Sequence, residues 1–441
     1  ESNLPSVDLP IVCVQLPTDS TADSSGGSLE PHLQLAIEHI FQCADLIAQE
    51  EGTGPIPVVI NFSYGHHRGP HDGTGVQEAA INQRIIDRRA MSGVPCNVVL
   101  PVGNSHLTRT HAEIDFRRVG ETRTLNWRVL PDDQSPSYVN IWLPRGTAAS
   151  RFEVRVTFPN GETSLALNEN TGLANTLDLT DMSGRQHGEI KYQFDPEAGR
   201  SVFQVTLNPT RRVVTVGGSM AQAGLWRLHL TNLGLNPDDI VNAWVDRDDT
   251  PIGFPIRGQQ SYFDHKDYRV YDDNGRYIET DDPSCSVRRA GTISGIATGD
   301  ETIVVGGYYR KPIYRIEDEQ ETYRLAEYSA GGPTNDAPNR AGPDAGAVSD
   351  DSRVHRGMLA AGTQSGSTVS LNGTSVAAPL VTRRIALEMA DGVDVTRSTV
   401  QGWVEATDPP PPAGRPYPRW GHGRIETPPV RPQKRYEPWP P

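Results

Sequence analysis

The chain of 441 residues has few cysteines and no long apolar run. The four cysteines (Cys13, Cys43, Cys96 and Cys285) are scattered and form no C-x-x-C pair. Such spacing excludes a disulfide scaffold and a cysteine-rich zinc site. No apolar stretch approaches the about 20 residues that a membrane-spanning helix needs. We therefore expect no membrane partner.

Positive charge is also scarce. The chain has 41 Lys and Arg residues against 55 Asp and Glu residues, which gives a net charge of −14. No run of basic residues forms a stripe, so we expect no nucleic-acid partner. The 36 prolines and 42 glycines predict many turns and loops. The chain begins at Glu1, so we expect its natural N-terminus to lie upstream or to have been processed.

The first part of the chain alternates apolar runs with helical periods. Residues 9–17, 57–62 and 96–102 read as buried strands, and residues 28–50 and 75–90 carry apolar side chains at helical spacing. Strands that alternate with helices predict a parallel sheet with helices on both faces. Ligands of such sheets bind beyond the carboxyl ends of the strands.

The pattern then changes to short segments of alternating apolar and polar residues. This pattern predicts an all-β sandwich inserted between two parts of an α/β core. A Pro-rich tail follows the second part. The predicted domains are residues 1–112, 113–250, 251–427 and 428–441.

Residues 372–379 read NGTSVAAP and contain the strongest candidate for chemistry. A serine at the start of a helix presents its hydroxyl beside the first N–H groups of the helix, which can stabilise an oxyanion. The alternative is an ordinary helix cap, because Ser and Thr are favoured there. Two further candidates follow predicted strands: Asn104, as a neutral amide donor, and residues 63–65 (SYG), as an edge that pairs with a peptide backbone.

Together these strings resemble motifs of the subtilisin-like serine peptidases. The nucleophile motif of that family is G-T-S-x-A-[AS]-P, and residues 342–345, 328–329 and 421–425 resemble further segments of it. The resemblance covers residues 9–112 and 291–427, and it implies a subtilisin-like core. It implies Ser375 as nucleophile and Asn104 in the oxyanion hole. It also implies motif support from Gly373 and Thr374, and substrate binding by Ser63, Tyr64, Gly65, Val102 and Gly103.

The chain departs from that family in its first part. A complete member carries its catalytic Asp and His before the strand that residues 9–17 resemble, in the order Asp, His, Ser. Residues 23–26 (DSSG) and 71–74 (HDGT) resemble those motifs but lie after that strand. A serine hydroxyl without a base is a weak nucleophile. We therefore expect this chain alone to be inactive, with Asp and His supplied by an upstream segment of its precursor.

Two functions fit these residues. The first is a serine endopeptidase that cleaves polypeptides by acyl transfer through Ser375. The alternative is a pseudopeptidase that binds peptides without cleaving them. An extracellular location is compatible with the resemblance.

No cofactor is expected. His66, His67 and His71 form a cluster that would suit a metal, but a solvated loop is the favoured interpretation. Residues 246–249 (DRDD) and 272–275 (DDNG) offer oxygen ligands for calcium without the spacing of an EF-hand. Roles in turns are favoured for both.

Overall fold

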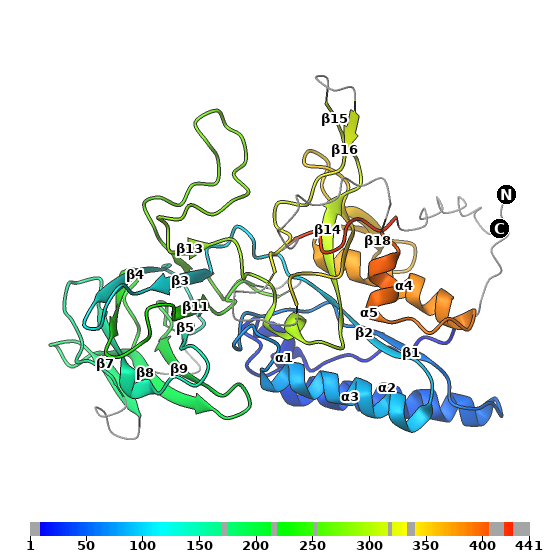
Figure 1. Ribbon diagram of the computed structural model, residues 1–441, viewed down its shortest axis with the longest axis horizontal. Coiled ribbons are helices and arrows are strands. Elements are labelled where there is room, and N and C mark those ends of the chain that lie inside the picture. The colour runs from blue at the N-terminus through cyan, green and yellow to red at the C-terminus, as the bar shows by residue number, and fades with distance from the viewer. Residues whose placement is uncertain are drawn as a thin grey trace.

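The computed structural model describes residues 9–168, 175–212, 218–250, 254–315, 320–332, 340–404 and 419–426. One side of the molecule carries the long helices, and the other side is built of strands (Figure 1). None of the helices in these ranges is long and apolar enough to cross a membrane. The predicted Pro-rich tail, residues 428–441, lies outside the described residues.

A four-stranded parallel sheet lies at the centre of the helical side. Its order is β1-β2-β14-β17. The strands are β1 (Val58–Asn61), β2 (Cys96–Pro101), β14 (Ile303–Tyr309) and β17 (Ala345–Asp350). Every residue of β2, β14 and β17 is buried, as continuous apolar runs of a covered parallel sheet require.

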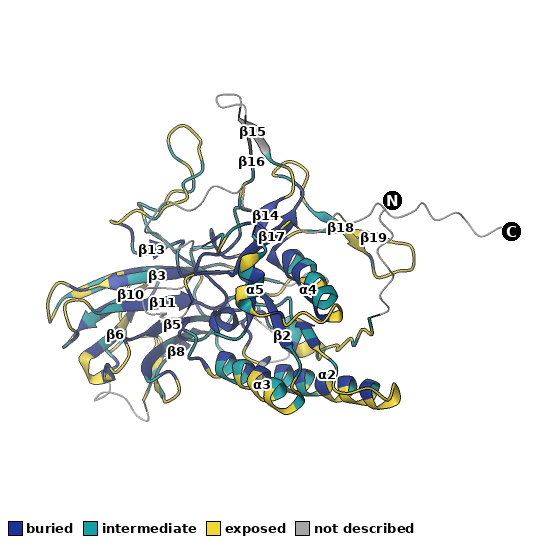
Figure 2. Ribbon diagram, turned by 45° about the vertical axis from the view of Figure 1, so that its right-hand side comes forward, coloured by how far each residue is buried: buried dark blue, intermediate teal, exposed yellow. Residues whose placement is uncertain are grey.

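Three long helices pack on this sheet: α2 (Glu30–Glu50), α3 (Val76–Ser92) and α4 (Thr374–Ala390). Helices α2 and α3 share one apolar cluster with β1 and β2, and α4 shares another with β14 and β17. Figure 2 shows their buried stripes against the strands and exposed residues outward. The 3.6-residue period of apolar side chains in α2 explains its one-sided burial.

The remaining large part of the molecule consists of two antiparallel sheets, which we call the β-rich part. Their orders are β12-β4-β10-β6 and β13-β3-β11-β5-β9-β8-β7. Buried side chains from both sheets form one apolar cluster, which includes Trp127, Trp226 and Phe203. The strands are β3 (His111–Asp115), β4 (Thr122–Val129), β5 (Ser137–Trp142), β6 (Phe152–Thr157), β7 (Thr176–Thr180), β8 (Gln186–Asp195), β9 (Arg200–Leu207), β10 (Gly224–Asn232), β11 (Ile240–Val245), β12 (Tyr262–Phe263) and β13 (Val287–Arg288).

Short elements complete the described chain. The helical ones are α1 (Thr18–Ala22), α5 (Arg397–Gly402) and the 3-10 turns η1 (Ala149–Arg151) and η2 (Gly295–Thr298). Two hairpins are formed by β15 (Ile313–Arg315) with β16 (Gln320–Thr322) and by β18 (Met358–Ala361) with β19 (Thr368–Leu371).

The predicted fold class, α/β with a subtilisin-like core and an inserted sandwich, is wrong. Among the described residues, helices take only 19%, and more residues lie in strands than in helices. The parallel sheet has four strands, whereas the two sheets of the β-rich part have four and seven. Two of those strands, β12 and β13, lie beyond residue 250. The long Gly- and Pro-rich connections leave little chain for helices. The predicted domain limits stay predictions.

The strand predicted at residues 9–17 is also wrong. These residues form no strand, and Ile11 is 84% exposed. Its apolar sequence suits a buried strand, but a strand forms only where a neighbour satisfies its backbone hydrogen bonds. No such neighbour lies beside it within the described residues.

Candidate functional site

Ser375 lies in the first turn of α4, and the backbone before it explains why. Gly373 precedes the helix with φ 121° and ψ 162°, a conformation that only glycine adopts readily. The Gly373 N–H donates to the Ser349 carbonyl oxygen at 3.2 Å and to Tyr328 Oη at 3.1 Å. The chain therefore enters the helix at a fixed angle, with Ser375 half-buried and its N–H among the first of the helix.

Asn104 follows β2 and contacts the start of the same helix. Its Oδ1 accepts hydrogen bonds from Thr374 N at 2.9 Å and from Thr374 Oγ1 at 3.0 Å. The Thr374 hydroxyl lies 3.2 Å from Gly103 N, which donates to it. These bonds hold the amide so that its Nδ2 lies beside Gly373, where a Cβ would come within 3.0 Å of it. The structure thus brings together two candidates separated by about 270 positions, and their catalytic roles stay predictions.

The hydroxyl of Ser375 has a backbone partner. Ser375 Oγ donates to the Ser63 carbonyl oxygen at 3.3 Å, and Ser63 Oγ donates to the Ser375 carbonyl oxygen at 3.0 Å. Among the described residues, no hydrogen bond joins Ser375 Oγ to an imidazole or a carboxylate. Within those residues the hydroxyl is therefore not hydrogen-bonded to a group that could act as its base.

The predicted substrate residues lie at the ends of β1 and β2, but several of their backbone groups are already bonded. The carbonyl oxygen of Val102 accepts from Ser294 N at 2.8 Å, and that of Gly103 accepts from Ala330 N at 3.0 Å. Arg247 Nη1 donates to the Gly65 carbonyl oxygen at 3.1 Å. A peptide that pairs with this edge would compete with Arg247 for the Gly65 oxygen.

Tyr64 ties the same edge to the loop at residues 23–26. Its hydroxyl donates to the Asp23 carbonyl oxygen at 2.9 Å. Burial raises the pKa of Tyr64 to about 12, so the hydroxyl keeps its proton and its role as a donor at neutral pH. The segment that resembles an Asp motif, residues 23–26, therefore supports the edge through a backbone oxygen.

The histidines of the 66–71 loop are buried, so the solvated-loop interpretation is wrong. Their exposed fractions are 2% for His66, 4% for His67 and 0% for His71. Burial lowers the pKa of His66 and of His67 to about 4. His71 stacks on Trp244 at a ring distance of 4.2 Å. The loop is buried because the β-rich part covers it, a contact between distant segments that local polarity does not reveal.

Within the described ranges, no group of three or more His, Cys, Asp or Glu side chains is arranged to hold a metal ion. The expectation of no cofactor, and the calcium alternative, stay predictions.

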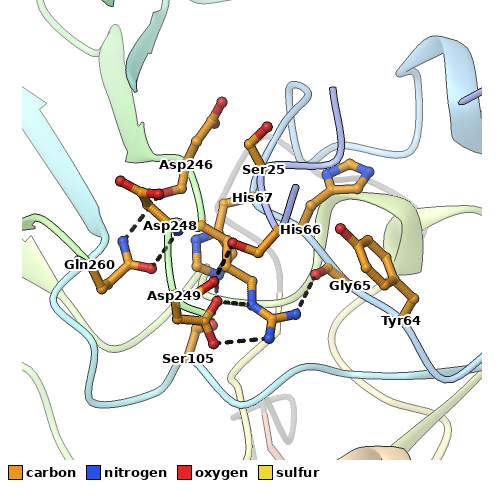
Figure 3. A network of polar contacts seen from close by, with 12 residues as sticks. Ser25, Tyr64, Gly65, His66, His67, Ser105, Asp246, Asp248, Asp249 and Gln260 are labelled. Carbon is orange, nitrogen blue, oxygen red and sulfur yellow. Dashed lines mark hydrogen bonds and ion pairs between the residues drawn. The ribbon is translucent and has the colours of Figure 1, made fainter. Parts of the chain in front are cut away.

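A polar network of the β-rich part surrounds the Gly65 edge (Figure 3). Arg247 donates to both carboxylate oxygens of Asp249, and Asp248 N donates to Gln260 Oε1 at 2.9 Å. Burial raises the pKa of Asp249, but the hydrogen bond and charge of Arg247 outweigh it and hold the pKa below its ordinary value. Sequence reasoning missed this network, because Arg247 and Gly65 are 182 positions apart.

Ser135 connects Asp248 of this network to a further carboxylate, that of Asp133. Ser135 Oγ lies 2.9 Å from Asp133 Oδ1 and 2.7 Å from Asp248 Oδ1. The Ser135 hydroxyl proton can be donated to only one of the two carboxylates at a time. Burial, together with the charge of Asp133, raises the pKa of Asp248 to about 9.

Comparisons with known proteins concern the fold. No model of a known protein family matches the chain, and no curated protein matches it. A solved structure described as "Structure of the Clostridium Perfringens CspB protease" is similar to it, with a TM-score of 0.59 and 15% sequence identity. The match covers 90% of this chain and 70% of the other. The two chains share a fold, and the solved one is a protease.

Proposed function

We propose that the chain carries the nucleophile of a serine endopeptidase. The observation that carries the proposal is the joint placement of Ser375 and Asn104 at the start of α4, with Thr374 bonded to the Asn104 amide. The motif resemblance of residues 372–379 to subtilisin-like serine peptidases supports it, and so does the likeness in fold to a protease.

The chemistry would be acyl transfer. Ser375 Oγ attacks the carbonyl carbon of the scissile peptide bond, its proton passes to a base, and the carbonyl oxygen becomes an oxyanion. The Asn104 amide and the Ser375 N–H would hold that oxyanion. The C–N bond then breaks, the leaving amine takes the proton from the base, and water hydrolyses the acyl-enzyme. The polypeptide substrate is part of this proposal.

The base is the component that the described residues do not provide. We propose that a His, oriented by an Asp, is supplied by an upstream segment of the precursor. Formation of that pair would require the Ser375 hydroxyl to turn from the Ser63 carbonyl toward the imidazole. The 3.3 Å length of the present bond favours such a turn, since a long hydroxyl bond is a weak one.

A peptide-binding pseudopeptidase is the second candidate. The bond between Ser375 Oγ and a backbone carbonyl favours it, because an imidazole partner is what an active serine requires. The retained Asn104 amide counts against it, since peptide binding alone needs no oxyanion donor.

Hydrolysis of casein separates the two candidates. The full precursor should release acid-soluble peptides. In its Ser375→Ala variant the rate of release should fall about 10⁶-fold, the effect known when the serine nucleophile of subtilisin is removed. Asn372→Ala, a change in the same loop that leaves the proposed nucleophile and the Asn104 amide in place, is the matched control. If the precursor binds casein and releases no peptides, the pseudopeptidase replaces the endopeptidase.

A further inference from the structure

His67 connects the β-rich part to the loop that carries Asn104. Its Nδ1 lies 3.0 Å from the carbonyl oxygen of Val245, at the end of β11. Its Nε2 lies 2.6 Å from Ser105 Oγ, and Ser105 directly follows Asn104. One buried ring therefore spans two parts of the molecule and ends one residue from the candidate oxyanion donor.

The direction of both hydrogen bonds follows from the groups involved. A carbonyl oxygen only accepts, so His67 Nδ1 carries the hydrogen and donates to Val245. In a neutral ring Nε2 then carries the lone pair and accepts the Ser105 hydroxyl proton. Burial lowers the pKa of His67 to about 4, which keeps the ring neutral around pH 7. The arrangement therefore has one stable pattern of donors and acceptors.

Asn104 itself is exposed, so its position depends on what holds its neighbours. Thr374 holds the amide from the side of the helix. On the other side, Ser105 is 8% exposed and its hydroxyl is bonded to His67. An exposed donor must be held closely, because a displacement of about 1 Å from the productive geometry costs on the order of 10²-fold in rate.

We propose that His67 is a positioning residue for Asn104 and acts through Ser105, so that docking of the β-rich part at Val245 sets the oxyanion hole. The inference rests on the proposed serine chemistry. It assigns the β-rich part a role in ordering the site.

The Ser105 and His67 pair also has the form of a nucleophile and its base, with the Val245 carbonyl as orienting group. Its burial opposes that use: the two side chains are 8% and 4% exposed, and a base with a pKa of about 4 removes a serine proton poorly at neutral pH. A supporting role is what this geometry permits.

Fluorophosphonate labelling of the full precursor tests the inference, with the adduct mapped by mass spectrometry. The rate is measured against probe concentration, which separates the maximal rate of adduct formation from the probe concentration at half-maximal rate. The variants are Ser105→Ala, His67→Leu and His67→Gln, each alone and combined with Asn104→Ala. Thermal unfolding checks that each one folds. Ser105→Ala removes one oxygen atom, and it provides the test if His67→Leu does not fold.

We expect Ser105→Ala and His67→Leu to lower the maximal rate at Ser375 about tenfold or more and to leave the half-maximal probe concentration unchanged. His67→Gln keeps a donor and an acceptor and should recover most of the rate. In the Asn104→Ala background neither change should slow labelling further. The inference is overturned if the maximal rate is unchanged, or if it falls as much in the Asn104→Ala background as in the wild-type background. An adduct on Ser105 also overturns it. A wild-type precursor without any adduct refutes the proposed serine chemistry instead, and the inference with it.

Discussion

Gly373→Ala is the substitution that most sharply tests how the backbone places Ser375. At φ 121° and ψ 162°, an alanine is strained by about 1–3 kcal/mol. Its Cβ would also lie 3.0 Å from Asn104 Nδ2, so the amide must move. We expect the melting temperature to fall by a few degrees, since 1 kcal/mol shifts it by about 2–4 °C in domains of 150–250 residues. We also expect labelling of Ser375 in the precursor to slow about tenfold or more.

Gly392→Ala is the matched control at the other end of α4. Gly392 also has positive φ, 82°, but a Cβ there meets nothing within 4 Å. It should lower the melting temperature through backbone strain alone and leave Ser375 labelling unchanged. The reasoning is refuted if Gly373→Ala labels at the wild-type rate, or if Gly392→Ala slows labelling as much.

Three other predictions follow from the same structure. Asn104→Ala should slow Ser375 labelling about 10²–10³-fold, the effect known for the corresponding donor in subtilisin. An unchanged rate would show that Asn104 does not stabilise the oxyanion. The folded chain holds the Asp248 proton to about pH 9, whereas an ordinary Asp loses it near 3.8. The free energy of unfolding, measured by chemical denaturation, should therefore fall between these two pH values, by up to about 1.4 kcal/mol per pH unit. Asp248→Asn should flatten this dependence on pH, and a variant with the same slope as the wild type would contradict the prediction. Trp244 is 1% exposed and stacked on His71 and His111, so Trp244→Ala should lower the free energy of unfolding by about 3–5 kcal/mol. A decrease under about 1 kcal/mol, measured by urea unfolding, would show that this contact does not hold the 66–71 loop.

Local pattern predicted the long elements of the helical side well. The apolar period over residues 28–50 gave a helix, and the structure has α2 at Glu30–Glu50. The runs at 57–62 and 96–102 contain β1 and β2. Local pattern does not show how large the β-rich part is relative to these elements, so the predicted fold class is wrong. Residues 9–17 show the same limit, because burial of an apolar run depends on partners that its own sequence does not name.

The candidate site likewise contains residues that a local pattern predicts and contacts that it does not. Short strings predicted Ser375 and Asn104 as site residues, because a serine at a helix start and an amide after a strand carry their signal within a few residues; the structure places the two side by side, and their roles stay predictions. The contacts of Arg247 with Gly65 and of His67 with Ser105 and Val245 carry no such signal. They join segments that meet only in the folded chain, and a polar loop with three histidines was accordingly read as solvated.

The most direct test of the central claim is the identity of the residue that reacts with a fluorophosphonate probe. The precursor with its upstream segment and the present chain alone are treated side by side, and the adducts are mapped by mass spectrometry. The account predicts an adduct on Ser375 in the precursor and none on the chain alone. An adduct on the chain alone would place the base within it, and no adduct in either protein would contradict the serine peptidase proposal.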